Sequence, residues 1–365
     1  MIIRVDRLIY VYLALCACLL LFNLAYTGRR RISDIRNPFR TKMWRAYLDK
    51  LTEEESMTDK QIKGLTRRLS HVSGLEAFQE TIDMICSEGK ETETWFGSVR
   101  PVFIHIGSRY LKKSVMEEAY YAYVVWQNKL CGNSEEDAIV RYMLQLICEH
   151  SIYCRENALK ALYKAGSPEL TVKAYKIMQR HGIDHSQKLV TDGLAGFAGN
   201  KEELAECLFR EWDKFTPYYQ TAFINFMRLS VDSFGERLLK LLVFPETDRE
   251  VKFAVIRYLR RHKYEPAAQY LQKLVRDWKV DDWEFPALAA SALENYPSQD
   301  TVHALDEAMH STSWYVRSNA SDSLLKTAGD EFVMDELLRS DKYAMEMIRY
   351  KQERRKEECR NDGCN

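Results

Sequence analysis

The chain has 365 residues, of which 46% are hydrophobic and 29% are charged, a composition typical of a folded protein with a sizeable core. Its 53 basic residues balance 53 acidic residues, and this zero formal charge argues against nucleic acid as a partner, because domains that bind nucleic acid are usually strongly basic. With only 15 Gly and 8 Pro residues, the composition also argues against a disordered or β-rich chain and favours helices.

The N-terminal segment, residues 1–28, is predicted to contain a transmembrane signal-anchor helix. Residues 8–26 form an uncharged and almost wholly apolar run of 19 residues. A helix of this length, rising about 1.5 Å per residue, just crosses a hydrocarbon core of about 30 Å. A cleaved signal peptide is the main alternative, but the run ends in a cationic block and not in a small-residue cleavage site. We therefore expect residues 8–26 to be retained in a lipid bilayer.

The basic segment that follows, residues 29–45, sets the expected orientation. It contains seven cations and a single acid, Asp34. By the positive-inside rule the protein crosses the membrane once and its C-terminal body is cytoplasmic. Nine irregularly spaced cysteines also suit a reducing compartment. Four arginines of the segment either act only as this topology signal or also bind lipid headgroups: Arg29, Arg30, Arg31 and Arg36.

Residues 46–113 are predicted to form a helical cap between the anchor and the rest of the chain. The sequence TDKQ at Thr58–Gln61 is typical of a capping box, in which the first and fourth side chains satisfy the free N–H groups of a helix N-terminus. We therefore expect a helix to begin just after Thr58.

Residues 114–340 contain a repeat of about 32 residues. In the stretch CRENALKALYKAG, small or apolar residues occupy the positions that form one face of a helix, and the same pattern returns along the chain. From Leu162 onward the corresponding positions are separated by 32, 33, 32, 34 and 31 residues. The equivalent residues are Tyr123, Leu162, Leu194, Met227, Leu259, Leu293 and Leu324.

Each interval between these copies holds another amphipathic helix, which is the first helix of a repeat whose second helix carries the pattern. Five are expected at residues 168–181, 201–212, 233–244, 265–278 and 299–310, and a sixth at 331–339. Pro168 and Pro266 lie in expected first turns. Gly166, Gly199 and Gly329 are expected as left-handed helix caps. Because one helical pair cannot bury its own apolar face, the repeats should stack. The predicted fold is an all-α solenoid of about seven helical hairpins, in the armadillo-like class.

The repeat resembles the HEAT-repeat family, particularly the short repeats also found in phycobilin lyases. The second helix of such repeats typically has the pattern V-R-x-x-A-x-x-A-L, matched by Val316, Arg317 and Ala320 and by the segment from Cys154 to Leu162. The resemblance covers about residues 114–339. It implies a stack of HEAT-like hairpins and says little about function, because such arrays have many roles.

We find no catalytic motif, and no cofactor is implied. The sequence lacks a Gly-rich phosphate loop, a nucleophile elbow and a paired C-x-x-C motif. Cys148, His150 and Cys154 are close in sequence, but their spacing is irregular, and Cys154 occupies a position that is apolar in other repeats. We therefore expect Cys154 in the core, and no metal site.

A series of aromatic residues precedes the second helix of several repeats. In a stacked array these residues would line one rim, beside helix N-termini. Aromatic side chains with a polar group suit protein interfaces, although packing between adjacent turns would also explain them. The series is interrupted at Ser186 and Glu250. The candidate partner-binding rim consists of Tyr153, Tyr218, Trp283, Trp314 and Tyr315.

The densest basic patch of the array is the sequence RYLRRHK. Its cations are expected either to form a solvated helix face near a C-terminal end or to bind an acidic partner or lipid. The candidate residues are Arg257, Arg260, Arg261 and Lys263. The last segment, residues 341–365, is expected to be a charged helix or tail, and its sequence from Arg349 onward is too charged to join a core.

These features lead to one main hypothesis for function. The chain is expected to be a membrane-anchored scaffold or accessory subunit, without catalytic activity, that binds a membrane-associated protein partner and no nucleic acid. One alternative, which the family resemblance allows, is a lyase-like enzyme acting on a tetrapyrrole–protein adduct. Another is a binding solenoid outside the cytoplasm.

Overall fold

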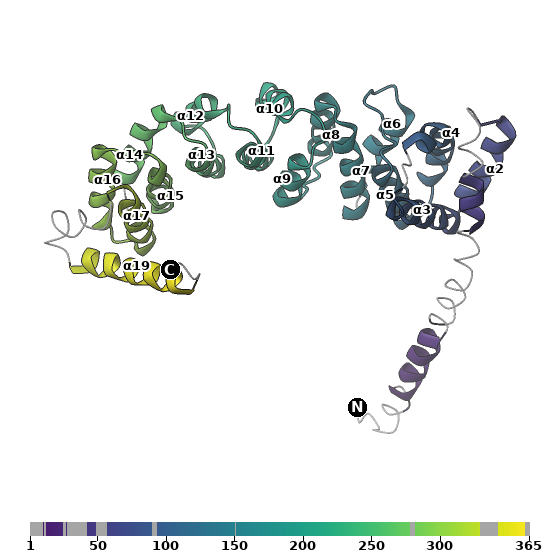
Figure 1. The fold of residues 1–365 in the computed structure, drawn as a ribbon, viewed down its shortest axis with the longest axis horizontal. Coiled ribbons are helices and arrows are strands. Elements are labelled where there is room, and N and C mark those ends of the chain that lie inside the picture. Colours follow the sequence, from purple (N-terminus) through teal and green to yellow (C-terminus); the bar gives the residue numbers. More distant parts are fainter. Residues whose placement is uncertain are drawn as a thin grey trace, which may run out of the picture. The chain divides into compact units, whose positions relative to one another are not determined.

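The structure is a computed structural model that describes residues 10, 12–24, 27, 42–48, 57–89, 93–149, 151–277, 282–328 and 342–361. Every regular element in this part of the chain is a helix (Figure 1). The prediction of an all-α protein is therefore confirmed. The chain divides into two compact units, residues 1–161 and 162–365, and each is described by itself.

The first unit is a set of helices that pack around a chain of buried aromatic rings. The expected capping box begins α2, where the Gln61 side chain accepts a hydrogen bond from the Thr58 backbone N–H at 2.7 Å. The ring of Phe78 lies 5.5 Å from that of Trp44 and 6.0 Å from that of Phe103. The helices are α2 (Asp59–Leu69), α3 (Val72–Ser87), α4 (Glu93–Tyr110), α5 (Val115–Gln127) and α6 (Ala138–Leu146).

The second unit is built from helical pairs at the predicted positions. Helix α7 (Ile152–Ala165) spans the boundary between the units. The following helices are α8 (Pro168–Arg180), α9 (Gln187–Ala195), α10 (Lys201–Arg210), α11 (Pro217–Ser230), α12 (Gly235–Val243), α13 (Arg249–Arg261), α14 (Ala268–Arg276), α15 (Glu284–Ala292), α16 (Gln299–Met309), α17 (Trp314–Thr327) and α19 (Lys342–Asn361), with short 3-10 turns η1 (Trp212–Lys214), η2 (Glu265–Ala267) and η4 (Leu293–Asn295).

Helices of successive pairs in the second unit stack on their counterparts. Helix α11 packs between α9 and α13, and α15 packs between α13 and α17. Partners within a pair also pack, as in α12 with α13, α14 with α15 and α16 with α17. This consecutive packing is that of a helical solenoid.

The predicted repeat positions form the layer between stacked helices. Leu162, Leu194 and Leu259 are fully buried, as are the corresponding residues of the later repeats. The residue predicted for the first copy, Tyr123, is only half-buried, so that prediction is wrong. Helix α5 does bury Ala119 and Ala122, which occupy positions of the repeat pattern. It also buries Tyr121, Val124 and Val125 in place of Tyr123, so its apolar face is shifted relative to that of the later repeats.

Helix caps follow the predictions in three of four described cases. Pro168 and Pro266 lie in the first turns of α8 and η2, and Gly166 has a positive φ of 75°. Gly199 is not a left-handed cap, because α9 already ends at Ala195. A side chain at Gly199 would meet the carbonyl oxygen of Gly166, with a Cβ only 2.3 Å away. Close backbone approach, and not φ, therefore requires this glycine.

The described part of the C-terminal segment is a helix, one of its two predicted forms, but it packs more closely than predicted. Helix α19 packs on α17 and buries Ala344 and Ile348. The Lys351 side chain, in the part expected to stay outside a core, is also buried and pairs with Asp322 at 2.6 Å. This charge can be buried because it has an opposite charge beside it.

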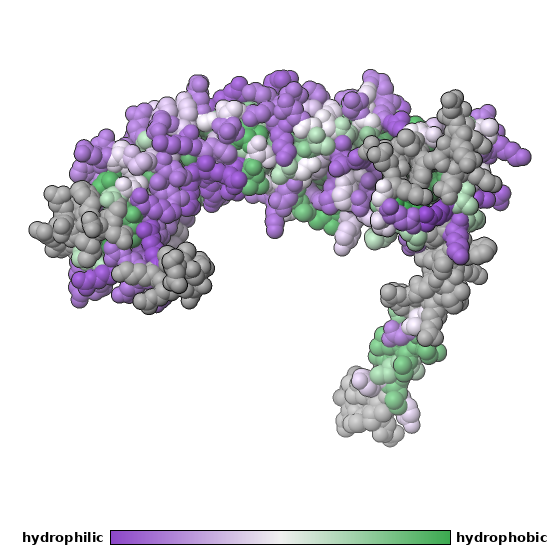
Figure 2. All heavy atoms as spheres, viewed as in Figure 1, coloured by the Kyte–Doolittle hydropathy of each residue, from purple (hydrophilic) through white to green (hydrophobic). Residues whose placement is uncertain are grey.

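The N-terminal apolar segment is helical over residues 12–24, and its large apolar side chains are 56–71% exposed. Figure 2 shows them as a continuous hydrophobic surface. None of the helices in the described residues is long and apolar enough to cross a membrane. Arg29, Arg30, Arg31 and Arg36, the cap predicted at Gly329 and the helix predicted at 331–339 lie outside the described residues. The predicted anchor, lipid contacts and domain boundaries remain predictions.

Candidate functional site

The residues of the predicted rim lie at helix N-termini. Tyr153 is the second residue of α7, Tyr218 is the second residue of α11, and Trp283 directly precedes α15. Tyr153 is 63% exposed, whereas Tyr218 is partly covered and donates a hydrogen bond to the His185 carbonyl oxygen at 3.2 Å. Tyr218 thus has a packing role at the end of its helix.

The structure brings three rim residues together in the second unit. The ring of Trp283 stacks on that of Tyr315, with centroids 4.6 Å apart and planes 18° apart. Trp314 meets Tyr315 edge-on at 5.3 Å. Because α15 and α17 are adjacent, aromatic residues from two repeats form one cluster. Trp314 and Tyr315 remain 51% and 55% exposed.

A charged and aromatic group extends this cluster toward α13, and the sequence reasoning did not identify it. Phe253 and Phe285 have ring centroids 4.6 Å apart, and the Arg249 guanidinium lies 5.0 Å from the Phe253 ring. Arg249 also pairs with Glu284 at 2.8 Å. Glu250 interrupts the aromatic series in this repeat. Its neighbour Arg249, the first residue of α13, lies over two aromatic rings instead. We call Arg249, Trp283, Phe285, Trp314 and Tyr315 the aromatic edge.

The predicted basic patch contains two kinds of cation. Arg260 pairs with Glu294 at 2.7 Å, and Lys263 pairs with Glu265 at 2.5 Å. Arg257 and Arg261 are exposed and form no ion pair with any carboxylate of the described residues. Half of the predicted patch is thus neutralised, and half is available to a ligand.

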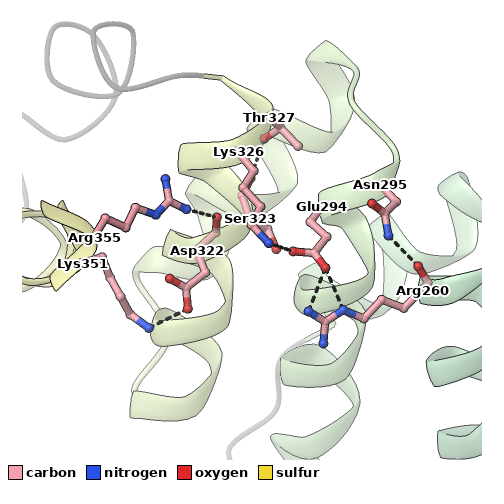
Figure 3. A network of polar contacts seen from close by, with 9 residues as sticks. All are labelled: Arg260, Glu294, Asn295, Asp322, Ser323, Lys326, Thr327, Lys351 and Arg355. Atoms are coloured by element: carbon pink, nitrogen blue, oxygen red, sulfur yellow. Dashed lines mark hydrogen bonds and ion pairs between the residues drawn. The ribbon is translucent and has the colours of Figure 1, made fainter. Parts of the chain in front are cut away.

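A polar cavity of about 340 Å³ lies where α13, α15, α17 and α19 approach one another. Glu294 is one of its lining residues. In Figure 3 it stands between Arg260 and Lys326 and accepts hydrogen bonds from both. Burial would raise the pKa of Glu294, but the hydrogen bonds from Lys326 and Arg260 outweigh it and hold the pKa below its usual range. Glu294 is therefore ionised and links the 3-10 turn η4 to α13 and α17.

The other side of this cavity holds α19 in place. Lys351 pairs with the Asp322 carboxylate, and Arg355 donates to the Asp322 carbonyl oxygen at 3.1 Å (Figure 3). Four of the lining cations thus have partners on neighbouring helical elements: Arg260, Lys326, Lys351 and Arg355. The simplest role of this network is to fix the C-terminal helix on α17.

A second cavity, of about 510 Å³, lies in the first unit between α3, α4 and the end of α5. Asn128 donates to Gln79 at 2.6 Å, and Gln79 donates to Asp83 at 2.8 Å, so these wall residues form a hydrogen-bonded chain. Arg100, also in the wall, pairs with Asp137. The hydrogen bonds and the ion pair connect these groups to one another and so support the wall.

The position of Cys154 suits packing in the core. Cys154 is fully buried, and its thiol donates to the Val115 carbonyl oxygen at 3.1 Å. Burial raises the pKa of the Cys154 thiol to about 11, so the thiol is protonated at neutral pH and is a poor metal ligand. Among the described residues no group of His, Cys, Asp and Glu could hold a metal ion, although His150 lies outside them.

The arginine of the repeat pattern has a structural role in both copies. Arg155 donates to the Glu149 carbonyl oxygen at 2.8 Å, and Arg317 donates to the Thr312 carbonyl oxygen at 3.1 Å. The residues two positions after these arginines are Asn157 and Asn319. Their side-chain amides donate to backbone carbonyl oxygens of α5 and α15, respectively, at 3.0 and 2.8 Å. These residues tie turns and neighbouring helices together.

No protein-family model matches the sequence, and no curated protein is significantly similar to it.

Proposed function

We propose that the protein is a membrane-anchored interaction scaffold or accessory subunit, without catalytic activity, whose HEAT-like helical repeats bind a partner protein in the cytoplasm. The single observation that carries this proposal is the aromatic edge. Trp314 and Tyr315 expose about half of their surface while being held in fixed ring contacts with Trp283.

Such an arrangement suits recognition of a protein. Trp, Tyr and Arg are the residues most often responsible for binding energy at protein interfaces. Rings that are already fixed by stacking lose little conformational entropy when a partner covers them. The edge also draws its residues from adjacent repeats, so a partner would contact several helices at once.

The exposed apolar helix at residues 12–24 supports the membrane part of the proposal. Large apolar side chains such as Leu15, Leu19 and Phe22 are rarely left in contact with water as a continuous surface. A bilayer would cover them. Confinement to a membrane would in turn raise the local concentration of the repeats around membrane-associated partners.

Site-specific photo-crosslinking of the full chain in cells tests this function. Crosslinkers at positions 314 and 315 should give a discrete adduct with one protein, whereas crosslinkers at the exposed charged positions Lys188 and Lys240 should not. The double substitution Trp314→Ala and Tyr315→Ala should weaken binding of the captured protein at least tenfold.

An unchanged helical circular dichroism spectrum of this double variant is the control for folding. Absence of any discrete adduct at the aromatic edge, or turnover of a small molecule by the purified chain, would show that the proposed function is wrong.

A further inference from the structure

Three arginines gather where α11 and α13 end. Arg228 lies in the last turn of α11, and Arg257 and Arg261 lie one turn apart near the end of α13, so the latter two share a helix face. Helices α11 and α13 pack side by side. His262 fixes their ends together, because its Nε2 donates to the Arg228 carbonyl oxygen at 2.8 Å.

This cluster has no anionic partner among the described residues. Neither Arg228, Arg257 nor Arg261 forms an ion pair there, although the neighbouring cations Arg260 and Lys263 do. The Nε–H of Arg228 is shielded from solvent and has no hydrogen-bond acceptor. A buried donor without an acceptor is rare in proteins and calls for an explanation.

The electrostatics of the cluster agree with a missing anion. Burial lowers the pKa of the Arg228 guanidinium, and the charges of Arg261 and Arg257 lower it further. The favourable field at a helix C-terminus explains why exposed cations stand at the end of α13. It does not explain why the shielded Nε–H of a third guanidinium, close enough to feel both charges, is left without an acceptor.

We propose that Arg228, Arg257 and Arg261 form a binding site for a phosphate group. A phosphate carries a charge of about −1.5 to −2 and several acceptor oxygens, which matches three neighbouring cations better than a single carboxylate does. Arginine is also the cation whose planar fork of donors fits phosphate oxygens. The group could belong to a soluble phosphate compound or to a phosphorylated lipid headgroup, which share this chemistry.

Thermal unfolding of the full chain in phosphatidylcholine nanodiscs tests the site in two arms. The first arm adds inorganic phosphate, with chloride at equal ionic strength as the reference. The second replaces part of the lipid with a phosphatidylinositol bisphosphate and adds no phosphate. A bound ligand raises the unfolding temperature, by about 2 °C for a concentration roughly ten times its dissociation constant. A rise in the second arm identifies a lipid headgroup as a ligand of the site. A rise in the first arm alone identifies a soluble ligand, because free phosphate would also occupy a site that binds the headgroup.

Two matched double variants distinguish this site from general charge attraction. Arg257→Gln with Arg261→Gln removes two unpaired cations, and Arg260→Gln with Lys263→Gln removes two paired cations from the same helix end. The first should weaken phosphate binding at least tenfold, and the second should leave it within about twofold. Equal loss in both variants would show that only net charge matters and would overturn the proposal, as would no temperature rise in either arm.

Arg228→Gln provides a readout that a structural role would not give. Because this change removes a cation from among like charges, the ligand-free variant should unfold at the same temperature as the unaltered chain or higher. Its response to ligand should be lost. A lower unfolding temperature without ligand would mean that Arg228 already has a stabilising partner, and the proposed site would be wrong.

Discussion

At the scale of single residues, the charges that matter most are those held between helices. Glu294 is the clearest example, since its side chain is 12% exposed and two cations from different helices donate to it. Arg260 belongs to α13 and Lys326 to α17, so one carboxylate connects both neighbours of α15. Most exposed ion pairs contribute little to stability, but a partly buried carboxylate with two charged donors contributes more.

We expect Glu294→Gln to lower the free energy of unfolding by about 1–2 kcal/mol at pH 7, because it leaves two cations without their shared anion. The folded-state pKa of Glu294 is lowered, so this stabilisation is present above the ordinary Glu pKa of about 4.3 and is lost as the pH falls through the folded value. Urea denaturation at pH 7 and below pH 4 checks both effects.

The matched control for this prediction is Glu307→Gln. Glu307 is 53% exposed and pairs only with Arg276 among the contacts described, so its loss should cost less than about 0.5 kcal/mol. Equal costs for the two variants, or a difference between Glu294→Gln and the unaltered chain that grows at low pH, would contradict the role assigned to Glu294.

At the scale of helices, close packing depends on residues whose intrinsic propensity is poor. Gly193 lies inside α9, where a glycine normally weakens a helix. A Cβ at this position would stand 2.5 Å from the ring of Tyr163. That ring cannot easily move, because it is buried and its hydroxyl is hydrogen-bonded to that of Tyr175. The helix accepts a poor helix former because only glycine leaves room for the neighbouring side chain.

Gly193→Ala should therefore destabilise the protein by about 1–2 kcal/mol, since the clash outweighs the gain of up to about 1 kcal/mol in helix propensity. Gly64→Ala in α2 should have the opposite sign and stabilise by about 0.5–1 kcal/mol, because no atom lies within 4 Å of the added Cβ. Chemical denaturation measures both changes. The same sign for both substitutions would mean that propensity, and not the contact with Tyr163, controls position 193.

At the scale of the whole molecule, the chain combines a polar helical array with an exposed apolar helix. The repeats bury their apolar faces against one another, as the buried positions of α9, α11 and α13 show. Residues 12–24 have no such cover among the described residues. The proposed anchor accounts for this difference, because lipid is the solvent in which an uncovered apolar helix is stable.

We expect the full chain to sediment with cell membranes and to resist extraction with alkaline carbonate. The double substitution Leu15→Arg and Leu19→Arg should release it, because each arginine near the centre of a span costs roughly 2.5–3.5 kcal/mol on insertion. Leu15→Ala with Leu19→Ala is the matched control and should stay in the membrane. If carbonate extracts the unaltered chain, the segment is not a transmembrane anchor.

Local features made much of the fold predictable. Amphipathic spacing, capping residues and the proline positions act within a few residues of one another, so they locate α7 to α17 and most of their buried faces. The prediction for Tyr123 was wrong because α5 buries Tyr121, Val124 and Val125 in its place. The prediction for Gly199 was wrong because this glycine is required by the close approach of the Gly166 backbone, and such an approach leaves no local signal in the sequence.

The functional surfaces were less predictable, because they depend on contacts between repeats. The sequence by itself determined that aromatic residues stand at helix N-termini and that α13 ends in a run of cations. Only the tertiary structure decided that Trp283 stacks on Tyr315, that Arg260 is neutralised by Glu294, and that Arg228 joins Arg257 and Arg261. The physical reason is that these partners lie about 30 residues apart in the chain and meet only where stacked helices bring their ends together.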